Sequence, residues 1–255
     1  MAKEYEMSNN LSFLDLIQEF KAFGEFAKFA NTAWTWRWTP RTERPQAILL
    51  IPGFLAGDVT LYPLANWLRS RGHHVFFSGI LANADCPRRA IERLARILQK
   101  QYERHGEKLV LIGHSLGGIY ARELARRMPQ CVEQTILMGA PVQAPGQHSH
   151  PFVKMLASMT MRVHEATRGC ACAMENVCGV HLDTPPPNVP ESLVFSKSDG
   201  VVSWTSCLES GPNVQAFEVD STHCGLPYNL ETLRIVHRLL ETPVEGRNGP
   251  SPHAN

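Results

Sequence analysis

Residues 108–128 read KLVLIGHSLGGIYARELARRM, and this stretch joins a short apolar run to a helical pattern through a glycine-rich turn. The run KLVLI is typical of a strand that is buried on both faces. The pattern that begins at Leu116 has helical periodicity, and Pro129 ends it. Between the two, residues 113–117 fit G-x-S-x-G, so we expect a sharp strand-to-helix turn that exposes the Ser115 hydroxyl.

Two glycines make this turn sterically possible. A Cβ atom at Gly113 or Gly117 would crowd the backbone, and the helix that follows points its free N–H groups and positive dipole end toward Ser115. A glycine-rich turn without chemistry is the alternative reading. The strand before it and the helix after it favour a nucleophilic serine.

Outward from this turn, strand and helix patterns alternate. We predict strands at 47–51, 74–77, 108–112, 134–138, 192–195 and 214–219. We predict helices at 61–71, 88–104, 116–128 and 229–240. Strands separated by helices form βαβ units, so the pattern predicts an α/β fold with a mostly parallel sheet of about six strands flanked by helices.

Composition narrows the class of protein. The chain has 255 residues, 44% of them hydrophobic and 19% charged, which is ordinary for a globular protein. Its 25 Lys and Arg nearly balance 24 Asp and Glu, so no charge pattern suggests nucleic acid as a partner. No apolar run of about 18 residues suggests a membrane-spanning helix. We therefore expect a soluble enzyme or binding protein.

A serine hydroxyl becomes a good nucleophile only when a base accepts its proton and a carboxylate orients that base. Asp199 follows the predicted strand at 192–195, and His223 lies in a loop after the last predicted strand. Both therefore fall at the sheet edge that carries Ser115, and we assign Asp199 as the acid and His223 as the general base. Glu218 and Asp220 are nearer to His223 in sequence but fit the place of the acid less well.

An oxyanion hole requires two N–H donors. We expect one from Leu116, the residue after the nucleophile, and one from Phe54 in the loop after the first core strand. Gly53 would permit close approach of that loop. An ordinary turn at the end of a strand is the alternative for this loop.

The sequence resembles members of the α/β-hydrolase superfamily, in particular small bacterial lipases and esterases. The resemblance lies in the order and spacing of four motifs: GHSLGG, the PGF loop, SDG and THCG. The resemblance covers about residues 45–240. It implies hydrolysis of carboxylic esters through an acyl-enzyme on Ser115, with small-molecule or lipid esters as substrates and neither a cofactor nor a metal. Two departures are Pro52, where many such lipases have His, and the early strands, for which only 34–39 (WTWRWT) offers a counterpart.

Two other functions fit the same motifs. In an acyltransferase of this fold, an alcohol or amine intercepts the acyl-enzyme instead of water. A non-catalytic binding protein with the α/β-hydrolase fold is the second alternative, although an ordered set of Ser, Asp and His argues against it.

The predicted domain, residues 45–242, contains a long insertion at about 141–190, which we interpret as a lid or substrate cap. Its apolar Met155 and Met159, together with Leu55, are candidates for substrate binding. Packing of the insertion onto the core would explain the same residues equally well. The tail, residues 243–255, is expected to be disordered.

Cysteines raise two further hypotheses. Cys170, Cys172, Cys178 and His181 have the ligand types of a zinc site but not the usual spacing, so packed thiols or a disulfide are the alternatives. A bridge between Cys207 and Cys224 would support the catalytic histidine loop. The odd total of seven cysteines leaves one thiol free or paired between chains. A chain of 255 residues is no disulfide scaffold, so we expect reduced thiols and a cytoplasmic location.

Residues 1–44 form an aromatic-rich, helical N-terminal segment. Its apolar residues recur at steps of three and four, at Phe13, Leu16, Ile17, Phe20, Phe23, Ala27, Ala30 and Trp34. Phe26 and Phe29 lie off this stripe. The stripe predicts a helix packed on the core or on a second subunit. Peripheral membrane contact through residues 11–36 is the alternative, with membrane association of a cytoplasmic protein. The oligomeric state stays open.

Overall fold

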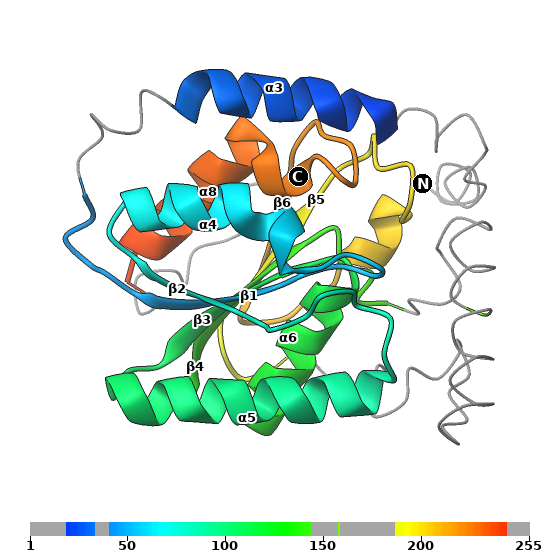
Figure 1. Cartoon of the computed structure of the whole chain (residues 1–255). Helices are drawn as coiled ribbons and strands as arrows, with labels where there is room; N and C mark the ends of the chain where they lie inside the picture. Colours follow the sequence, from blue (N-terminus) through cyan, green and yellow to red (C-terminus); the bar gives the residue numbers. More distant parts are fainter. Residues whose placement is uncertain (1–18, 34–40, 144–157, 159–186, 244–255) are drawn as a thin grey trace.

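The computed structural model describes residues 19–33, 41–143, 158 and 187–243. Within these residues six strands form one parallel sheet in the order β2-β1-β3-β4-β5-β6 (Figure 1). The strands are β1 (Ala47–Ile51), β2 (His74–Phe77), β3 (Leu109–His114), β4 (Val132–Met138), β5 (Glu191–Phe195) and β6 (Val214–Glu218). The predicted α/β fold with about six parallel strands is confirmed.

Helices cover both faces of the sheet (Figure 1). The α-helices are α3 (Ala22–Ala33), α4 (Tyr62–Ser70), α5 (Pro87–His105), α6 (Leu116–Arg127) and α8 (Leu230–Glu241). Short 3-10 turns are η1 (Glu19–Lys21), η3 (Asp58–Leu61), η4 (Trp204–Cys207) and η5 (Leu226–Tyr228). Helices α5 and α6 lie on one face, whereas α4 and α8 lie on the other with α3 outside them (Figure 1).

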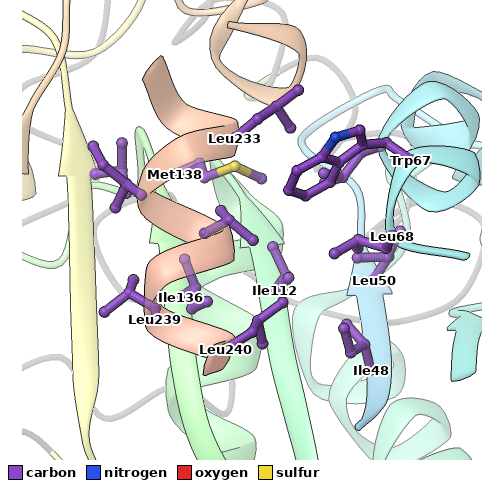
Figure 2. Close-up of a cluster of buried hydrophobic side chains, with 14 of the residues drawn as sticks. Ile48, Leu50, Trp67, Leu68, Ile112, Ile136, Met138, Leu233, Leu239 and Leu240 are labelled. Carbon is purple, nitrogen blue, oxygen red and sulfur yellow. The ribbon is translucent and has the colours of Figure 1, made fainter. Parts of the chain in front are cut away.

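Strand β1 shows why the sequence forms a two-sided core. Successive side chains of a strand point to opposite faces, and all five residues of β1 are buried. Ile48 and Leu50 pack in the core under α4 and α8 (Figure 2), whereas Leu49 and Ile51 pack in the core under α5 and α6. Each such side chain stabilises the fold by about 1.5–3 kcal/mol. A run of Ile and Leu without alternation is therefore the pattern that this sheet requires.

The strand order places two loops side by side. After β2 the chain returns past β1 and adds β3 on the other side, so the order reverses at β1 and β3. Neighbouring carboxyl ends at such a reversal leave a crevice, where open α/β sheets carry their sites. The loop after β1 and the turn after β3 therefore lie at the position where this fold places a functional site.

Helix α3 packs on the domain with a face other than the predicted stripe. Phe29, which lies off the predicted apolar stripe, is only 4% exposed, whereas Phe23, on the stripe, is 73% exposed. Ala27 and Ala30, also on the stripe, are exposed. The structure therefore contradicts packing of the stripe on the core for these residues, while packing on a second subunit and membrane contact stay predictions. Glu25 lies on the face of α3 that is turned to the domain, where it accepts hydrogen bonds from Thr222 and Asn229.

Several predicted features lie outside the described residues. They are the first part of the N-terminal stripe, the candidate strand at 34–39, most of the insertion at 141–190 and the tail from 244 on. Among the helices that the structure describes, none is both long and apolar enough to cross a lipid bilayer.

Candidate active site

Ser115 occupies a strained turn between β3 and α6. Its φ is +53°, a value that a residue with a side chain rarely adopts. A Cβ atom at Gly117 would lie 2.2 Å from the carbonyl oxygen of Ile51, and one at Gly113 would lie 2.4 Å from that of Gly117. The Ser115 amide donates a hydrogen bond of 2.8 Å to the carbonyl of Met138. The glycines thus allow the turn that the sequence pattern predicts.

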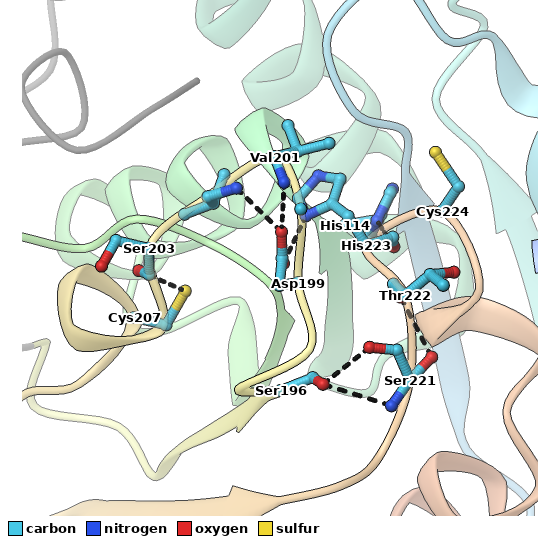
Figure 3. Close-up of polar contacts among 12 residues, drawn as sticks. His114, Ser196, Asp199, Val201, Ser203, Cys207, Ser221, Thr222, His223 and Cys224 are labelled. Atoms are coloured by element: carbon cyan, nitrogen blue, oxygen red, sulfur yellow. Dashed lines mark hydrogen bonds and ion pairs between the residues drawn. The ribbon is translucent and has the colours of Figure 1, made fainter. Parts of the chain in front are cut away.

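Asp199 and His223 form a direct pair across the loops that follow β5 and β6. The Nδ1 atom of His223 lies 2.6 Å from Oδ2 of Asp199 (Figure 3). The other carboxylate oxygen, Oδ1, accepts the amide N–H groups of Val201 and Val202, both at 2.8 Å. Both members of the pair are buried. Asp199 is thus held by its own loop while its free oxygen orients the imidazole.

Glu218 and Asp220, the two acids that we did not assign as the partner of His223, bind other side chains. Asp220 is exposed and accepts a hydrogen bond of 3.0 Å from the Ser198 hydroxyl. Glu218 pairs with Lys197 at 3.0 Å. Of the carboxylates considered from the sequence, Asp199 is the one that contacts the ring of His223.

The imidazole of His223 is balanced between two opposing effects. Burial lowers its pKa, but the charge of Asp199, the hydrogen bond to Asp199 and the charge of Glu19 raise it, and the net pKa lies above its ordinary value. A base with such a pKa takes up a proton readily. This is the property that a general base in ester hydrolysis requires.

The loops that follow β1, β4 and β6 lie close to the Ser115 turn or to His223. A Cβ atom at Gly53 would lie 3.1 Å from the Cβ of Ser115, and one at Gly139 would lie 3.1 Å from Nδ1 of His223. His114, which precedes Ser115, has its ring centroid 4.9 Å from that of His223. The carboxyl ends of β1, β3, β4 and β6 therefore converge on one small region.

His114 binds the backbone of His223, the predicted base. Its Nε2 atom lies 2.9 Å from the carbonyl oxygen of His223. Burial and the neighbouring His223 lower the pKa of His114 to about 3, so the ring is neutral near neutral pH. A neutral ring that donates from Nε2 fixes the backbone of the residue that carries the base. The sequence placed His114 in the motif, but nothing in the pattern indicated this contact.

The predicted oxyanion donors lie at this same edge. Phe54 follows Gly53 in the loop after β1, and Leu116 is the first residue of α6. Within the described part of the chain, the amide N–H of neither residue donates a hydrogen bond. Leu55, a predicted substrate-binding residue, has φ +58° and is 43% exposed.

A second loop, which sequence reasoning missed, holds the Phe54 loop in place. The buried Asn83 donates from Nδ2 to the Pro52 carbonyl at 2.7 Å. Its backbone pairs with the same loop through Leu55 N–H to Asn83 O at 3.0 Å and Asn83 N–H to Ala56 O at 2.8 Å. Asn83 thereby supplies support to a loop whose Pro52 replaces the histidine found in many similar lipases.

Ser196 links the acid loop to the base loop and was also missed. Its hydroxyl donates to the Ser221 carbonyl at 2.6 Å and accepts the Ser221 amide N–H at 3.2 Å (Figure 3). Single serines after a strand carry no distinguishing sequence signal. The contact depends on the neighbouring positions of β5 and β6 in the sheet.

The proposed bridge between Cys207 and Cys224 is wrong, because both residues are free thiols. Cys207 is buried in η4, where its Sγ lies 3.9 Å from the Ser203 carbonyl, whereas Cys224 is exposed. Hydrogen bonds, among them those of Ser196, support the histidine loop instead.

Three groups of predicted site residues lie outside the described residues: Met155, Met159 and the set Cys170, Cys172, Cys178 and His181. Within the described residues, no three His, Cys, Asp or Glu side chains are arranged to hold a metal ion.

Comparisons with known proteins agree with this fold. Residues 78–176 match the family model described as "Serine aminopeptidase, S33". Methyl jasmonate esterase 1 of Vitis vinifera is 25% identical over 167 residues, which are 62% of this chain and 59% of that protein. The match therefore spans about three fifths of the length of this curated relative.

Three solved structures share the fold. An α/β-hydrolase from a sediment metagenome of the lagoon of Mar Chica, Morocco, has a TM-score of 0.55 at 16% identity, over 79% of this chain and 92% of that one. Naproxen esterase of Bacillus subtilis has a TM-score of 0.52 at 15% identity, over 78% and 85%. A Bacillus licheniformis lipase has 0.53 at 14% identity, over 78% and 94%. The chain is related to the α/β-hydrolase superfamily.

Proposed function

We propose that the chain is a serine hydrolase that cleaves carboxylic esters through an acyl-enzyme. The observation that carries the proposal is the pair of Asp199 and His223, which meet at 2.6 Å at the sheet edge where Ser115 stands on a strained turn. The esterases and lipases among the similar proteins support the same reaction class.

In the proposed reaction His223 takes the Ser115 proton as the hydroxyl attacks the ester carbonyl, and Asp199 stabilises the imidazolium that forms. The amide N–H groups of Phe54 and Leu116 bind the oxyanion. The imidazolium then returns its proton to the leaving alkoxide, which leaves an acyl group on Ser115. A water molecule activated by His223 releases the acid, and the enzyme regains its starting state.

Fluorophosphonate labelling of the full chain tests the proposal, because this probe reacts with activated serines. We expect the wild type to be labelled and Ser115→Ala and His223→Ala to be unlabelled. Ser206→Ala is the matched control: it also removes a buried serine hydroxyl, in η4, and should be labelled like the wild type. A folded wild type without labelling would overturn the proposal and favour a binding protein.

Nitrophenyl esters of acetate, butyrate and octanoate then define the acyl preference. The exposed Leu55 beside the Phe54 loop favours apolar acyl groups. Turnover that falls steeply from acetate to octanoate would contradict a lipid-like substrate. Addition of acceptor alcohols during turnover separates hydrolysis from acyl transfer, since a transferase would form the new ester in preference to the free acid.

A further inference from the structure

The carboxylate of Glu19 is bound by two loops of the site. Its Oε1 accepts the amide N–H of Gly200 at 3.0 Å and that of His223 at 2.9 Å. Its Oε2 accepts the amide N–H of Cys224 at 2.8 Å. Gly200 follows the acid Asp199, and His223 is the base. One side chain from η1 therefore joins the backbone of the acid loop to that of the base loop.

These three donors have no other acceptor in the described part of the chain. Consecutive N–H groups such as those of His223 and Cys224 form a concavity that binds anions. Hydrogen bonds to an ionised acceptor are stronger than those to a neutral one. The carboxylate of Glu19 thus satisfies donors that the two loops leave unpaired, and it fixes the spacing between them.

Glu25 repeats this arrangement one step along the same loop. Its Oε2 accepts the Thr222 hydroxyl at 2.8 Å and the Thr222 amide N–H at 3.3 Å. Its Oε1 accepts Nδ2 of Asn229, the residue that caps α8, at 3.2 Å. A Cβ atom at Gly225 would collide with this carboxylate. The two glutamates together hold residues 222–224 from the side of the N-terminal helix.

Aromatic packing keeps the helix in this position. Phe29 is buried and its ring meets Tyr228 edge-on at 6.2 Å, while Phe26 meets the same ring at 5.7 Å. Tyr228 belongs to η5, which directly follows the base loop. Residues 19–33 therefore contact the segment that carries His223 in two ways. Phe26 and Phe29 pack on Tyr228, and the carboxylates of Glu19 and Glu25 bind residues 222–224.

We propose that Glu19 is a positioning residue, which acts through the backbone of Gly200, His223 and Cys224 to keep Asp199 and His223 in register for catalysis. This inference rests on the proposed function of the site. It makes the N-terminal segment a part of the active site and not only a helix packed on the outside of the domain.

The charge of Glu19 offers a readout that a purely structural contact would not move. The charged or titratable groups near His223 are Asp199 from the acid loop, Glu19 and Glu25 from the N-terminal segment, His114 from the turn after β3, and the neighbouring Cys224. Burial and Glu19 raise the pKa of the Cys224 thiol to about 12, so it stays neutral over the range in which His223 titrates. Glu19 contributes to the raised pKa of His223. Ester hydrolysis requires the neutral imidazole, so loss of the Glu19 charge should move the acid limb of kcat/KM to lower pH.

The experiment compares Glu19→Gln and Glu19→Asp with Glu43→Gln in the full chain. Glu43 is exposed and makes none of these contacts with the two loops. Its substitution therefore removes one negative charge, as Glu19→Gln does, without a change at the loops. For Glu19→Gln we expect kcat to fall about 10- to 100-fold, because small displacements of reacting groups cost that much. KM should stay within about twofold, because the residue binds loops and not substrate. The acid limb should move to lower pH.

Glu19→Asp separates charge from reach. It keeps the carboxylate but shortens the side chain by one methylene, so its acid limb should stay near that of the wild type while kcat falls. Glu43→Gln should match the wild type in both kcat and acid limb. Equal kcat and equal acid limbs for Glu19→Gln and the wild type would overturn the inference.

Hydrogen exchange followed by mass spectrometry keeps this result apart from failure of the proposed function. In Glu19→Gln, exchange in peptides that contain Gly200 and residues 223–224 should accelerate about 10-fold or more, whereas peptides from β1 should not change. Unchanged exchange in all peptides would overturn the positioning role whatever the enzyme does. An unlabelled wild type with accelerated exchange in the variant would overturn the proposed function alone.

Discussion

Asp199 uses its two carboxylate oxygens for different purposes. Oδ1 is fixed by the N–H groups of Val201 and Val202, so the side chain cannot rotate without the loss of two hydrogen bonds. Oδ2 is thereby aimed at Nδ1 of His223. An acid held in this way selects the imidazole tautomer with the proton on Nδ1, which leaves Nε2 free to accept the serine proton.

Asp199→Asn tests this division of roles. Oδ1 would keep its backbone contacts, but an amide nitrogen would face Nδ1 and favour the wrong tautomer. We expect kcat to fall by about 10⁴-fold. Because the charge of Asp199 raises the pKa of His223, the acid limb of kcat/KM should move to lower pH. A pH–rate profile of the variant, measured with a nitrophenyl ester, checks both; an unmoved limb would contradict the assignment.

At the scale of elements, the loops after β1 and β2 form one unit. Asn83 joins them by one side-chain bond and two backbone bonds. Asp58 adds a second link, since Oδ1 accepts the Ser78 hydroxyl at 2.6 Å and Oδ2 accepts the Ile80 amide at 3.2 Å. The position of the Phe54 amide therefore depends on residues of the loop after β2 as well as on its own loop.

Asn83→Ala should loosen this unit. We expect kcat to fall about 10-fold, less than the 10²–10³-fold that follows removal of an oxyanion donor, because the Phe54 amide is displaced and not lost. KM should change little. Leu81→Ala, at a side chain that is 96% exposed in the same loop, is the control and should keep wild-type kcat. Steady-state kcat and KM of the wild type, Asn83→Ala and Leu81→Ala test this prediction. An unchanged kcat in Asn83→Ala would show that the loop after β2 does not position the Phe54 amide.

The sequence predicted the elements well and their contacts less well. The strand and helix patterns were readable because a parallel sheet buried on both faces needs uninterrupted apolar runs, as in β1. The positions of Asp199 and His223 followed from the strand ends. The contacts of Glu19, Glu25 and Asn83 could not be predicted, because their partners are distant in the chain and, for Glu19 and Asn83, are backbone groups. The face of α3 that packs on the domain could not be predicted from the stripe either, because it carries Glu25 and Phe29.

At the scale of the whole molecule, buried histidines link stability to pH. Burial lowers the pKa of His73 to about 4, and its Nδ1 accepts the Gln46 amide N–H at 3.3 Å. His114 is held neutral in the same way. In the unfolded chain both rings have their ordinary pKa of about 6.5. The unfolded state therefore binds more protons between these values, and stability falls as the pH is lowered through this range.

Urea unfolding at pH 7, 6 and 5 measures this effect. We expect His73 alone to cost about 1–2 kcal/mol between pH 7 and pH 5, with His114 adding to the loss. His73→Gln should lose less stability than the wild type over the same interval, since the glutamine does not titrate. Parallel pH dependence of the two proteins would show that folding does not lower the pKa of His73, and would contradict the prediction.

The sheet order also determines when activity can arise during synthesis of the chain. Ser115 leaves the ribosome early, with β3, but its proposed base follows β6, which pairs at the edge of the sheet only after β5 is in place. A chain that is still being made thus carries an inert serine. Because long-range parallel pairing is slow, we expect the proposed catalytic residues to come together only when β6 has paired with β5, late in folding.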